Sequence, residues 1–339
     1  MPYQSQSTTY SSQPGHLIDR YGRIVTYMRL AITDRCNLRC RYCMPPEGVA
    51  NTFRDRILSY EELLRLARIF VNLGIGKIRV TGGEPFVRKG VMGFLGQLKE
   101  VSGIHALHLT TNGAALADHV GELATLSIDG INLSLDTLKP ERFRHIARRD
   151  LFVRVRAALD AVLAAGIPLK INTVVQCGVN TDEIAALASL ACSHPLTVRF
   201  IEEMPFNGLG ERVSHCWESA RIQAELERQF PGMKKVARVS GTAALYHVPA
   251  FVGTVGIIGA YSRQFCGSCD RIRITSQGML KTCLYGDGCL DLRKMLRRGD
   301  TDEEIRKAVL SAVAGKPKNG FVAEENYHRR KTSMATIGG

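Results

Sequence analysis

Short apolar runs alternate with longer amphipathic segments over the first two thirds of the chain. Six of the runs have the length and the β-branched content typical of buried strands. Two of the intervening segments, 59–74 and 152–166, carry apolar residues at helical spacing and end at a glycine, and the first begins with a serine cap. The predicted strands cover residues 27–33, 77–85 with a terminal turn, 105–113, 130–136, 168–176 and 197–205.

The spacing of these strands predicts an α/β fold. Strands separated by helical segments need right-handed crossover connections, which build a parallel sheet. Apolar runs such as Ile-Asn-Thr-Val-Val (171–175) suit strands covered on both faces. An open doubly wound sheet and an incomplete (β/α) barrel both fit this pattern. In either fold, ligands bind at the carboxyl ends of the strands.

Unusual residues stand at those carboxyl ends. A cysteine loop (34–43) follows the first predicted strand, Gly-Gly-Glu-Pro (82–85) the second, and Thr-Thr-Asn-Gly (110–113) the third. Because all six ends meet at one edge of the sheet, we expect a single site there. The last three strands contribute Ser134, Asn172 and Met204.

The chain divides into three parts by composition. Residues 1–16 are rich in Ser, Thr and Gln, carry no motif, and are predicted to form a disordered N-terminal extension. The strand–helix units occupy 17–205, and the more irregular region 206–339 is expected to pack on their open face. No apolar run is long enough for a bilayer and no secretory signal begins the chain, so we expect a cytoplasmic protein.

The charge balance favours an anionic partner. Lys and Arg number 45 against 32 Asp and Glu, a formal net charge of +13. No long basic run occurs, and no aromatic pattern of the RNP type accompanies the charge. Phosphates are therefore favoured over nucleic acid, and neither a nucleic-acid nor a membrane partner is expected.

Ten cysteines in a cytoplasmic chain of this length indicate metal ligands more than disulfides. Cys36, Cys40 and Cys43 form C-x3-C-x2-C without a fourth cysteine. Three thiolates can bind three irons of a [4Fe–4S] cluster and leave the fourth iron open, whereas zinc would need a fourth ligand at short spacing. Scattered cysteines, predicted to be buried small apolar side chains, are Cys177, Cys192, Cys216 and Cys289.

A second trio consists of Cys266, Cys269 and Cys283. Zinc is a stronger alternative here, because Cys289 or His247 could complete a four-ligand site. The residues between the cysteines favour iron over zinc.

Arg271 and Arg273 follow the first two cysteines of this trio and share one side of a short predicted strand. Two guanidiniums beside an open-iron cluster form a fork for phosphate or base acceptors. The alternative is a solvated edge strand.

The cysteine loop, with Tyr42 before its last cysteine, resembles the signature of the radical S-adenosylmethionine (SAM) enzymes. In those enzymes SAM chelates the open iron, and one electron splits it into methionine and a 5′-deoxyadenosyl radical. Gly-Gly-Glu-Pro resembles their motif for the SAM amino group, where Glu84 can accept hydrogen bonds from an ammonium.

The order of motifs over residues 20–339 resembles one family in particular, the GTP 3′,8-cyclases of molybdenum cofactor biosynthesis. The motifs are DRCNLRCRYCMP, GGEP, LTTNG, INLSLD, RFIEEMP, FCGSCDRIRIT, LKTCL and a terminal IGG. The resemblance implies an incomplete (β/α)6 TIM-type barrel over 17–205. The C-terminal region would carry a second iron–sulfur cluster, the GTP-binding residues and a Gly-Gly tail.

The resemblance also implies roles for individual residues. Gly338 and Gly339 would reach into the active site, and Arg271 and Arg273 would take part in catalysis. The [4Fe–4S] ligands would be Cys36, Cys40 and Cys43 for the first cluster, and Cys266, Cys269 and Cys283 for the second. The SAM contacts would be Tyr42, Gly83, Ser134 and Met204. The GTP contacts would be Arg29, Arg79, Thr110, Lys170, Arg271 and Arg273.

In the implied reaction, the 5′-deoxyadenosyl radical abstracts the C3′ hydrogen of GTP, and C3′ then bonds to C8 of guanine. The product, 3′,8-cyclo-7,8-dihydro-GTP, would pass to cyclic pyranopterin monophosphate synthase. A flavodoxin- or ferredoxin-type protein would supply electrons, and the enzyme would be a homodimer or a monomer. Cys289 lies outside the family pattern and is predicted not to bind iron.

Two other functions fit parts of the sequence. A radical SAM peptide-modifying enzyme with an auxiliary cluster would share the first half of the chain. A zinc-bearing nucleic-acid-binding module would account for the basic charge and the two cysteine groups.

Overall fold

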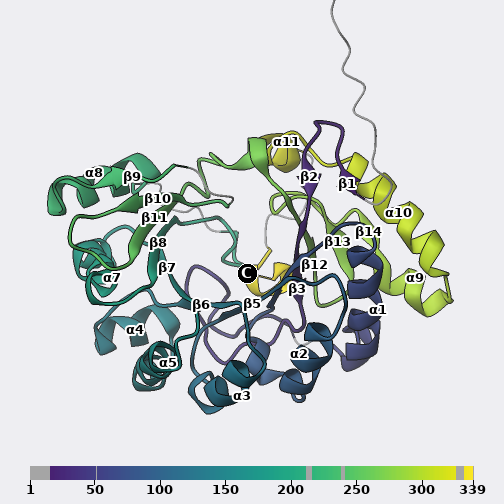
Figure 1. Cartoon of the computed structure of the whole chain (residues 1–339), viewed down its shortest axis with the longest axis horizontal. Helices are drawn as coiled ribbons and strands as arrows, with labels where there is room; N and C mark the ends of the chain where they lie inside the picture. Colours follow the sequence, from purple (N-terminus) through teal and green to yellow (C-terminus); the bar gives the residue numbers. More distant parts are fainter. Residues whose placement is uncertain (1–15, 51, 211–215, 238–240, 326–331, 339) are drawn as a thin grey trace, which may run out of the picture.

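A curved sheet of twelve strands forms the centre of the molecule (Figure 1). The computed structural model describes residues 16–50, 52–210, 216–237, 241–325 and 332–338, so nearly all of the predicted N-terminal extension lies outside the described residues. The strand order is β14-β13-β12-β3-β4-β5-β6-β7-β8-β11-β10-β9, and the sheet is not closed. The six predicted strands are β3 (Tyr27–Ala31), β4 (Lys77–Thr81), β5 (Ala106–Thr111), β6 (Gly130–Ser134), β7 (Leu169–Val175) and β8 (Thr197–Glu202).

These six strands are neighbours in chain order, and every pairing between them is parallel. The α/β fold predicted from the sequence is therefore confirmed, and the open, curved sheet has the form of a partial barrel. All six strands end earlier than the predicted ranges. The first ends at Ala31 and the sixth at Glu202, which leaves Met204 in the following loop.

Side chains alternate between the two faces of each strand. In β3, Met28 and Leu30 are fully buried in the apolar core, whereas Tyr27 and Arg29 line a cavity on the other face. Because successive side chains point to opposite faces, one face of the strand packs in the core and the other lines the cavity.

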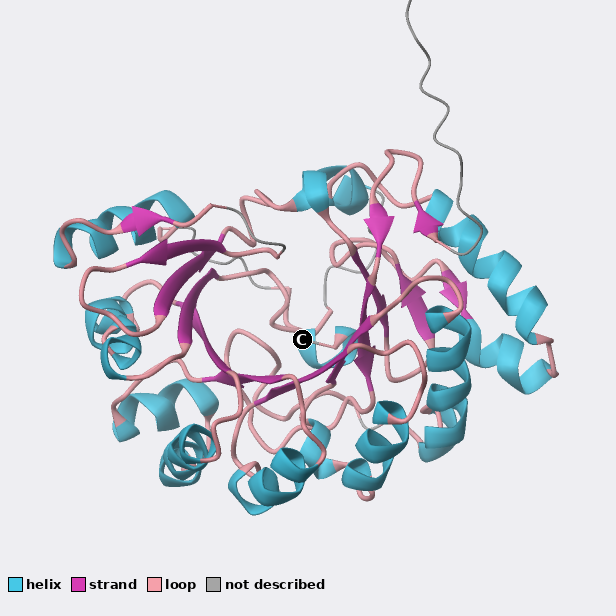
Figure 2. Cartoon of the chain, viewed as in Figure 1, coloured by secondary structure: helices cyan, strands magenta, loops and turns pink. Residues whose placement is uncertain are grey.

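Helices cover the outer, convex face of the parallel strands (Figure 2). Helix α1 (Tyr60–Val71) begins with the predicted capping box, in which Ser59 and Glu62 satisfy each other's backbone amides, and Gly74 follows it with φ +90°. The other helices of this region are α2 (Val91–Lys99), α3 (Val120–Thr125), α4 (Pro140–Ala147), α5 (Phe152–Ala164), α6 (Ile184–Ala188) and α7 (Leu190–Ser193). Single 3-10 turns occupy Arg54–Arg56, Pro85–Val87, Ala117–His119, Thr181–Glu183 and Cys266–Ser268.

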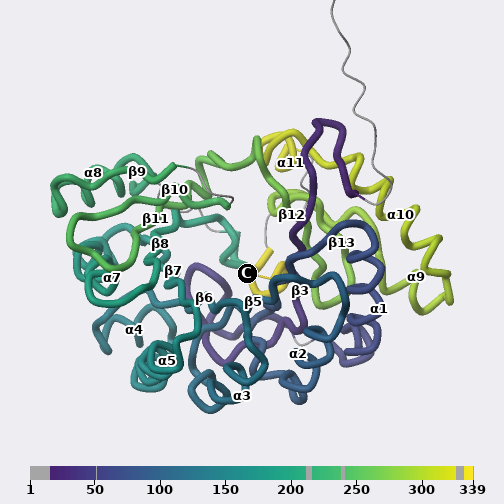
Figure 3. The backbone as a smooth tube through the Cα atoms, in the orientation of Figure 1, coloured from purple at the N-terminus to yellow at the C-terminus, as the bar shows by residue number. Residues whose placement is uncertain are grey.

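The C-terminal region extends both edges of the same sheet, which the sequence did not predict. Strand β11 (Thr254–Ile258) lies parallel to β8, and β12 (Arg271–Ile274) lies parallel to β3. Figure 3 shows β3 beside β12, although the two strands come from opposite ends of the chain. The remaining strands of the sheet are antiparallel: β9 (Lys234–Lys235), β10 (Ala244–His247), β13 (Met279–Lys281) and β14 (Leu290–Asp291).

The last elements bring the chain end back to the concave side of the sheet, where the C-terminus lies in Figure 1. A separate two-stranded ribbon, β1 (Leu17–Ile18) with β2 (Ile24–Val25), precedes the sheet. The C-terminal helices are α8 (Ser219–Gln229), α9 (Leu292–Arg298), α10 (Asp302–Ala314), α11 (Gly320–Glu325) and α12 (Met334–Ile337). None of the described helices is long and apolar enough to cross a membrane.

Candidate functional site

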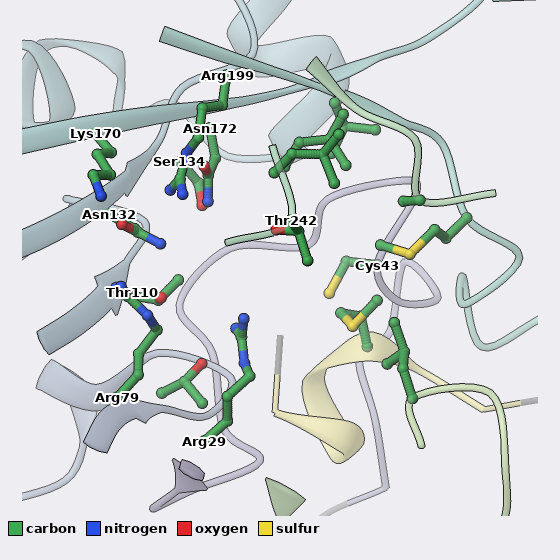
Figure 4. A pocket seen from close by; sticks show the side chains of 18 of the residues that line it. Arg29, Cys43, Arg79, Thr110, Asn132, Ser134, Lys170, Asn172, Arg199 and Thr242 are labelled. Carbon is green, nitrogen blue, oxygen red and sulfur yellow. The ribbon is translucent and has the colours of Figure 1, made fainter. Parts of the chain in front are cut away.

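A cavity of about 420 Å³ occupies the concave side of the sheet. Every parallel strand from β3 to β8 contributes to its wall, as do β12 and the chain end. In Figure 4, cationic and amide side chains fill one side of this space and the thiol of Cys43 faces it from the other. The structure thus brings the strand ends together at one site, as the sequence predicted.

The first cysteine trio stands in the loop after β3. Cys36, Cys40 and Cys43 all line the cavity and none forms a disulfide. The backbone amides of Arg39 and Arg41 donate to carbonyls at the end of α4, at 2.9 and 3.0 Å, and this holds the loop on the helix. The thiols therefore face inward from a fixed backbone.

Burial keeps these thiols protonated in the absence of a metal. It raises the pKa of Cys36 to about 11 and that of Cys43 to about 12, and burial together with the neighbouring Cys43 also raises the pKa of Cys40. Metal binding must displace those protons.

The glycine pair after β4 lies directly under the cysteine loop. A Cβ atom on Gly83 would stand 2.3 Å from the carbonyl oxygen of Arg35, and one on Gly82 would stand 2.5 Å from that of Thr33. The amide of Gly83 donates to Thr33 at 2.8 Å. These positions require glycine because two backbones touch there.

Glu84 makes hydrogen bonds within the protein. Its buried carboxylate accepts from the Thr111 hydroxyl at 2.8 Å, the Asn112 amide at 2.7 Å and the Phe86 amide at 3.2 Å. It therefore joins the loop after β4 to the loop after β5, and it is not part of the cavity wall. These three donors leave acceptor capacity on the carboxylate, so a hydrogen bond from a ligand ammonium to Glu84 stays a prediction.

The positions expected to contact SAM line the cavity. Among them the Tyr42 hydroxyl donates to Asp136 at 2.9 Å, and the other oxygen of Asp136 accepts from the Val174 amide at 2.8 Å. Burial raises the pKa of Asp136 to about 6. The sequence did not single out Asp136, although it is the last residue of the predicted fourth strand. The four expected positions are Tyr42, Gly83, Ser134 and Met204.

Cations form a second group in the wall. Burial, together with the neighbouring Arg199, lowers the pKa of Lys170 to about 8, and burial and Arg271 lower that of Arg273 to about 10. Such shifts mark positive charges that repel one another in a poorly solvated space. The expected GTP contacts all lie in this wall: Arg29, Arg79, Thr110, Lys170, Arg271 and Arg273.

Tyr27 lies at the centre of the guanidiniums. Burial alone would raise its pKa, but Arg79, Arg29 and Arg271 together lower it to about 7. Arg79 donates to the Tyr27 hydroxyl at 2.5 Å and to the carbonyl oxygen of Leu109 at 2.8 Å.

Several cavity residues were missed on the sequence. Arg199 and Lys77 are cations in the wall, and Asn132 points into the same space (Figure 4). Within the described structure, three buried polar atoms have no hydrogen-bond partner: Nε and Nη2 of Arg199 and Oδ1 of Asn172. Buried polar atoms of this kind are typical of a ligand-binding site. The available signal was a lone arginine in the apolar strand Thr-Val-Arg-Phe-Ile (197–201).

The second trio lines the same cavity. Cys266 begins the 3-10 turn before β12 and Cys269 follows that turn, whereas Cys283 follows β13. All three thiols are free of disulfides. Across the described ranges, no three His, Cys, Asp or Glu side chains surround a position for one metal ion. A [4Fe–4S] cube attaches each cysteine to a different iron, so a trio needs no such shared position.

The chain end is built into the site. Ser333 donates to the carbonyl oxygen of Cys43 at 2.6 Å, and the carbonyl oxygen of Gly338 accepts from Arg273 at 2.8 Å. Gly338 is buried with φ +88°, and a Cβ atom on it would stand 2.7 Å from that of Ala31. The tail thus connects both cysteine regions, while Gly339 lies outside the described residues.

The prediction for the scattered cysteines is wrong in the structure. Cys177 and Cys216 form a disulfide with Cα atoms 6.1 Å apart, because the loops after β7 and β8 meet. Cys192 and Cys289 are exposed. The Cys289 thiol donates to the carbonyl oxygen of Leu280 and is not part of the cavity wall, so its lack of an iron role stays a prediction.

Two family models cover most of the chain. The radical SAM superfamily matches residues 30–191, and Molybdenum Cofactor Synthesis C matches residues 196–322. A GTP 3′,8-cyclase of Peptoclostridium acidaminophilum is 39% identical over 95% of this chain and 98% of that protein. A GTP 3′,8-cyclase of Heliobacterium modesticaldum is 40% identical over 95% of this chain and 100% of that protein.

A solved structure shares the fold at low sequence identity. SuiB of Streptococcus suis, bound to SAM, superposes with a TM-score of 0.61 at 14% identity, covering 84% of this chain and 69% of that one. At this identity the likeness shows the fold alone.

Proposed function

The chain belongs to the GTP 3′,8-cyclase family of radical SAM enzymes, and we propose that it cyclises GTP in the cavity of its curved sheet. The product would be 3′,8-cyclo-7,8-dihydro-GTP, in the first step of molybdenum cofactor biosynthesis. One observation carries the proposal: a single cavity holds two cysteine trios and a wall of cations. Family membership argues against a peptide-modifying enzyme and against a zinc-bearing nucleic-acid-binding module.

The first trio suits a [4Fe–4S] cluster with SAM. Cys36, Cys40 and Cys43 are three free thiols on one loop, and that number leaves one iron for a non-protein ligand. When bound there with SAM, the cluster supplies the electron that splits SAM into methionine and a 5′-deoxyadenosyl radical. The protein's part is to hold this group and to exclude water from it.

Four residues would position SAM. We assign Ser134, at the end of β6, and Met204, in the loop after β8, to it because both line the same cavity as the glycine pair. Tyr42 is held in place by Asp136, and the bare backbone of Gly83 allows close approach.

The cations would bind the triphosphate. Arg29, Lys170 and Arg199 come from three different strands and point toward the same space in Figure 4. Each well-formed charge-assisted hydrogen bond contributes roughly 1.5–3 kcal/mol, and a triphosphate also relieves the repulsion among these cations. The full set we assign to GTP is Arg29, Arg79, Thr110, Lys170, Arg271 and Arg273, with Lys77 and Arg199 added from the structure.

The second trio and the tail would orient the nucleoside. Cys266, Cys269 and Cys283 suit a second [4Fe–4S] cluster next to Arg271 and Arg273, which would hold the purine. The 5′-deoxyadenosyl radical would take the C3′ hydrogen of GTP, and the resulting C3′ radical would add to C8 of guanine. One electron from the proposed electron donor and one proton would then convert the nitrogen-centred radical on the base into the 7,8-dihydro product. By holding the ribose and the base in contact, the protein would favour formation of the C3′–C8 bond through the orientation of the two groups. No side chain needs to act as a general base in this step.

Partners follow from the same assignment. We propose that a flavodoxin- or ferredoxin-type protein supplies electrons and that cyclic pyranopterin monophosphate synthase takes the product. A cytoplasmic location and a homodimeric or monomeric state remain predictions.

Anaerobic incubation with GTP, SAM and a reductant tests the proposal. We expect 5′-deoxyadenosine and a cyclised nucleotide by mass spectrometry, and about eight irons per reconstituted chain. A matched Cys36→Ala chain should give neither product. Zinc in place of iron, or an unaltered GTP pool beside full SAM cleavage, would contradict it.

A further inference from the structure

Lys316, just beyond α10, is a buried lysine that the proposed mechanism does not use. Its side chain belongs to a residue only 2% exposed. The ammonium donates to the carbonyl oxygen of Arg271 at 2.8 Å, to that of Thr282, and to the thiol sulfur of Cys269 at 3.6 Å. An ammonium has three donors and no acceptor, so these three partners use all of its hydrogen-bonding capacity.

The three partners belong to the two segments that carry the second cysteine trio. Cys269 and Arg271 lie at the start of β12, and Thr282 precedes Cys283 at the end of β13. One side chain therefore ties together the backbones that present two of the three cysteines.

The segment around Lys316 also supports the third cysteine. Arg23 donates to the carbonyl oxygens of Pro317 and Lys318, at 2.6 and 2.8 Å, and to that of Cys266 at 2.9 Å. Asp19 holds this guanidinium through an ion pair of 2.5 Å. Residues 316–318 thus act as a common support for the whole trio.

The charge of Lys316 is not balanced by a carboxylate. Among the described residues, no Asp or Glu lies within ion-pair distance of its ammonium, although Lys316 is buried. A buried cation is stabilised by an anionic partner. A thiolate at Cys269, as an iron ligand would be, supplies the missing negative charge.

We propose that Lys316 is a positioning residue for the second cluster, which holds Cys269 as a ligand and sets the reduction potential of that cluster. This inference rests on the proposed function, because that function places the cluster there. Reduction adds one electron and one negative charge to the cluster. Hydrogen bonds and positive charge at a ligand sulfur stabilise that added charge, so Lys316 makes the potential more positive.

The test measures the second cluster alone. In the full chain with Cys36, Cys40 and Cys43 replaced by Ala, reconstitution should give about four irons. An EPR-monitored redox titration then compares this parent with Lys316→Met, which removes charge and donors, and with Lys316→Arg, which keeps the charge. Lys318→Met is the matched control, because that side chain is exposed and only its backbone carbonyl contacts Arg23.

We expect Lys316→Met to retain the cluster with a more negative potential, Lys316→Arg to lie between it and the parent, and Lys318→Met to match the parent. Loss of iron from Lys316→Met alone would also support the role in holding Cys269, and Lys316→Gln would then report the potential. A full cluster with an unmoved potential in Lys316→Met would overturn the role of Lys316. A parent that binds no iron would instead overturn the proposed second cluster.

Discussion

Lys170 shows how a single side chain in this cavity responds to its neighbours. Its pKa is lowered to about 8 by burial and then by Arg199, Lys77 and Arg79. Below pH 8 the free enzyme therefore presents an ammonium to a triphosphate, and above pH 8 it presents a neutral amine. Bound phosphate favours the charged form, so the pKa must rise in the complex.

The dissociation constant for GTP should therefore increase with pH above about 8, by at most about tenfold per pH unit until the pKa of the complex is reached. Isothermal titration calorimetry between pH 7 and 9.5 measures this. The Lys170→Arg variant, which keeps its charge over that range, should show a flatter profile. Identical profiles for the two proteins would show that Lys170 does not contact the phosphates.

The contact between the loop after β4 and the cysteine loop sets the geometry at the scale of elements. Gly83→Ala would place a methyl group against the carbonyl oxygen of Arg35, at 2.3 Å in the present backbone. Since neither backbone can yield without moving cysteines, we expect the iron content to fall by about half, with the second cluster retained.

Iron analysis and EPR of reconstituted protein check this prediction. Gly93→Ala, on α2, is the control, because a Cβ atom there meets no atom within 4 Å. A Gly83→Ala chain with both clusters and normal SAM cleavage would show that the loop tolerates the added methyl group.

At the scale of the whole molecule, the C-terminal end of the chain forms part of the cavity wall. The carbonyl oxygen of Gly338 accepts a hydrogen bond from Arg273. The φ of +88° at Gly338 and the contact of this residue with Ala31 leave no room for a side chain. Deletion of Gly338 and Gly339 should abolish cyclisation while SAM is still cleaved and iron content is unchanged, because the cysteines lie elsewhere.

Mass spectrometry of 5′-deoxyadenosine and of the nucleotide in one reaction separates these outcomes. A chain lacking residues 2–15 serves as the control and should behave as the full chain does. Normal turnover by the enzyme without its last two glycines would refute a catalytic role for the tail.

Local patterns predicted the six parallel strands and the helices at 59–74 and 152–166, because alternation, caps and glycine stops are short-range signals. The joining of β12 to β3 could not be predicted, since it pairs Arg271 with Tyr27 from the far end of the chain. Likewise, nothing in the sequence indicated that Cys177 would form a disulfide with Cys216. Nor did it indicate that the Glu84 carboxylate would accept hydrogen bonds from Thr111 and Asn112. Such contacts depend on how loops meet in space.

We propose that this cavity holds GTP with its ribose C3′ hydrogen beside the 5′-carbon released from SAM. The most direct measurement uses GTP deuterated at C3′ in the anaerobic reaction, followed by mass spectrometry of 5′-deoxyadenosine. We predict one deuterium in the 5′-deoxyadenosine and none remaining at C3′ of the cyclised nucleotide. Formation of 5′-deoxyadenosine without deuterium, from GTP that keeps its label, would contradict the account.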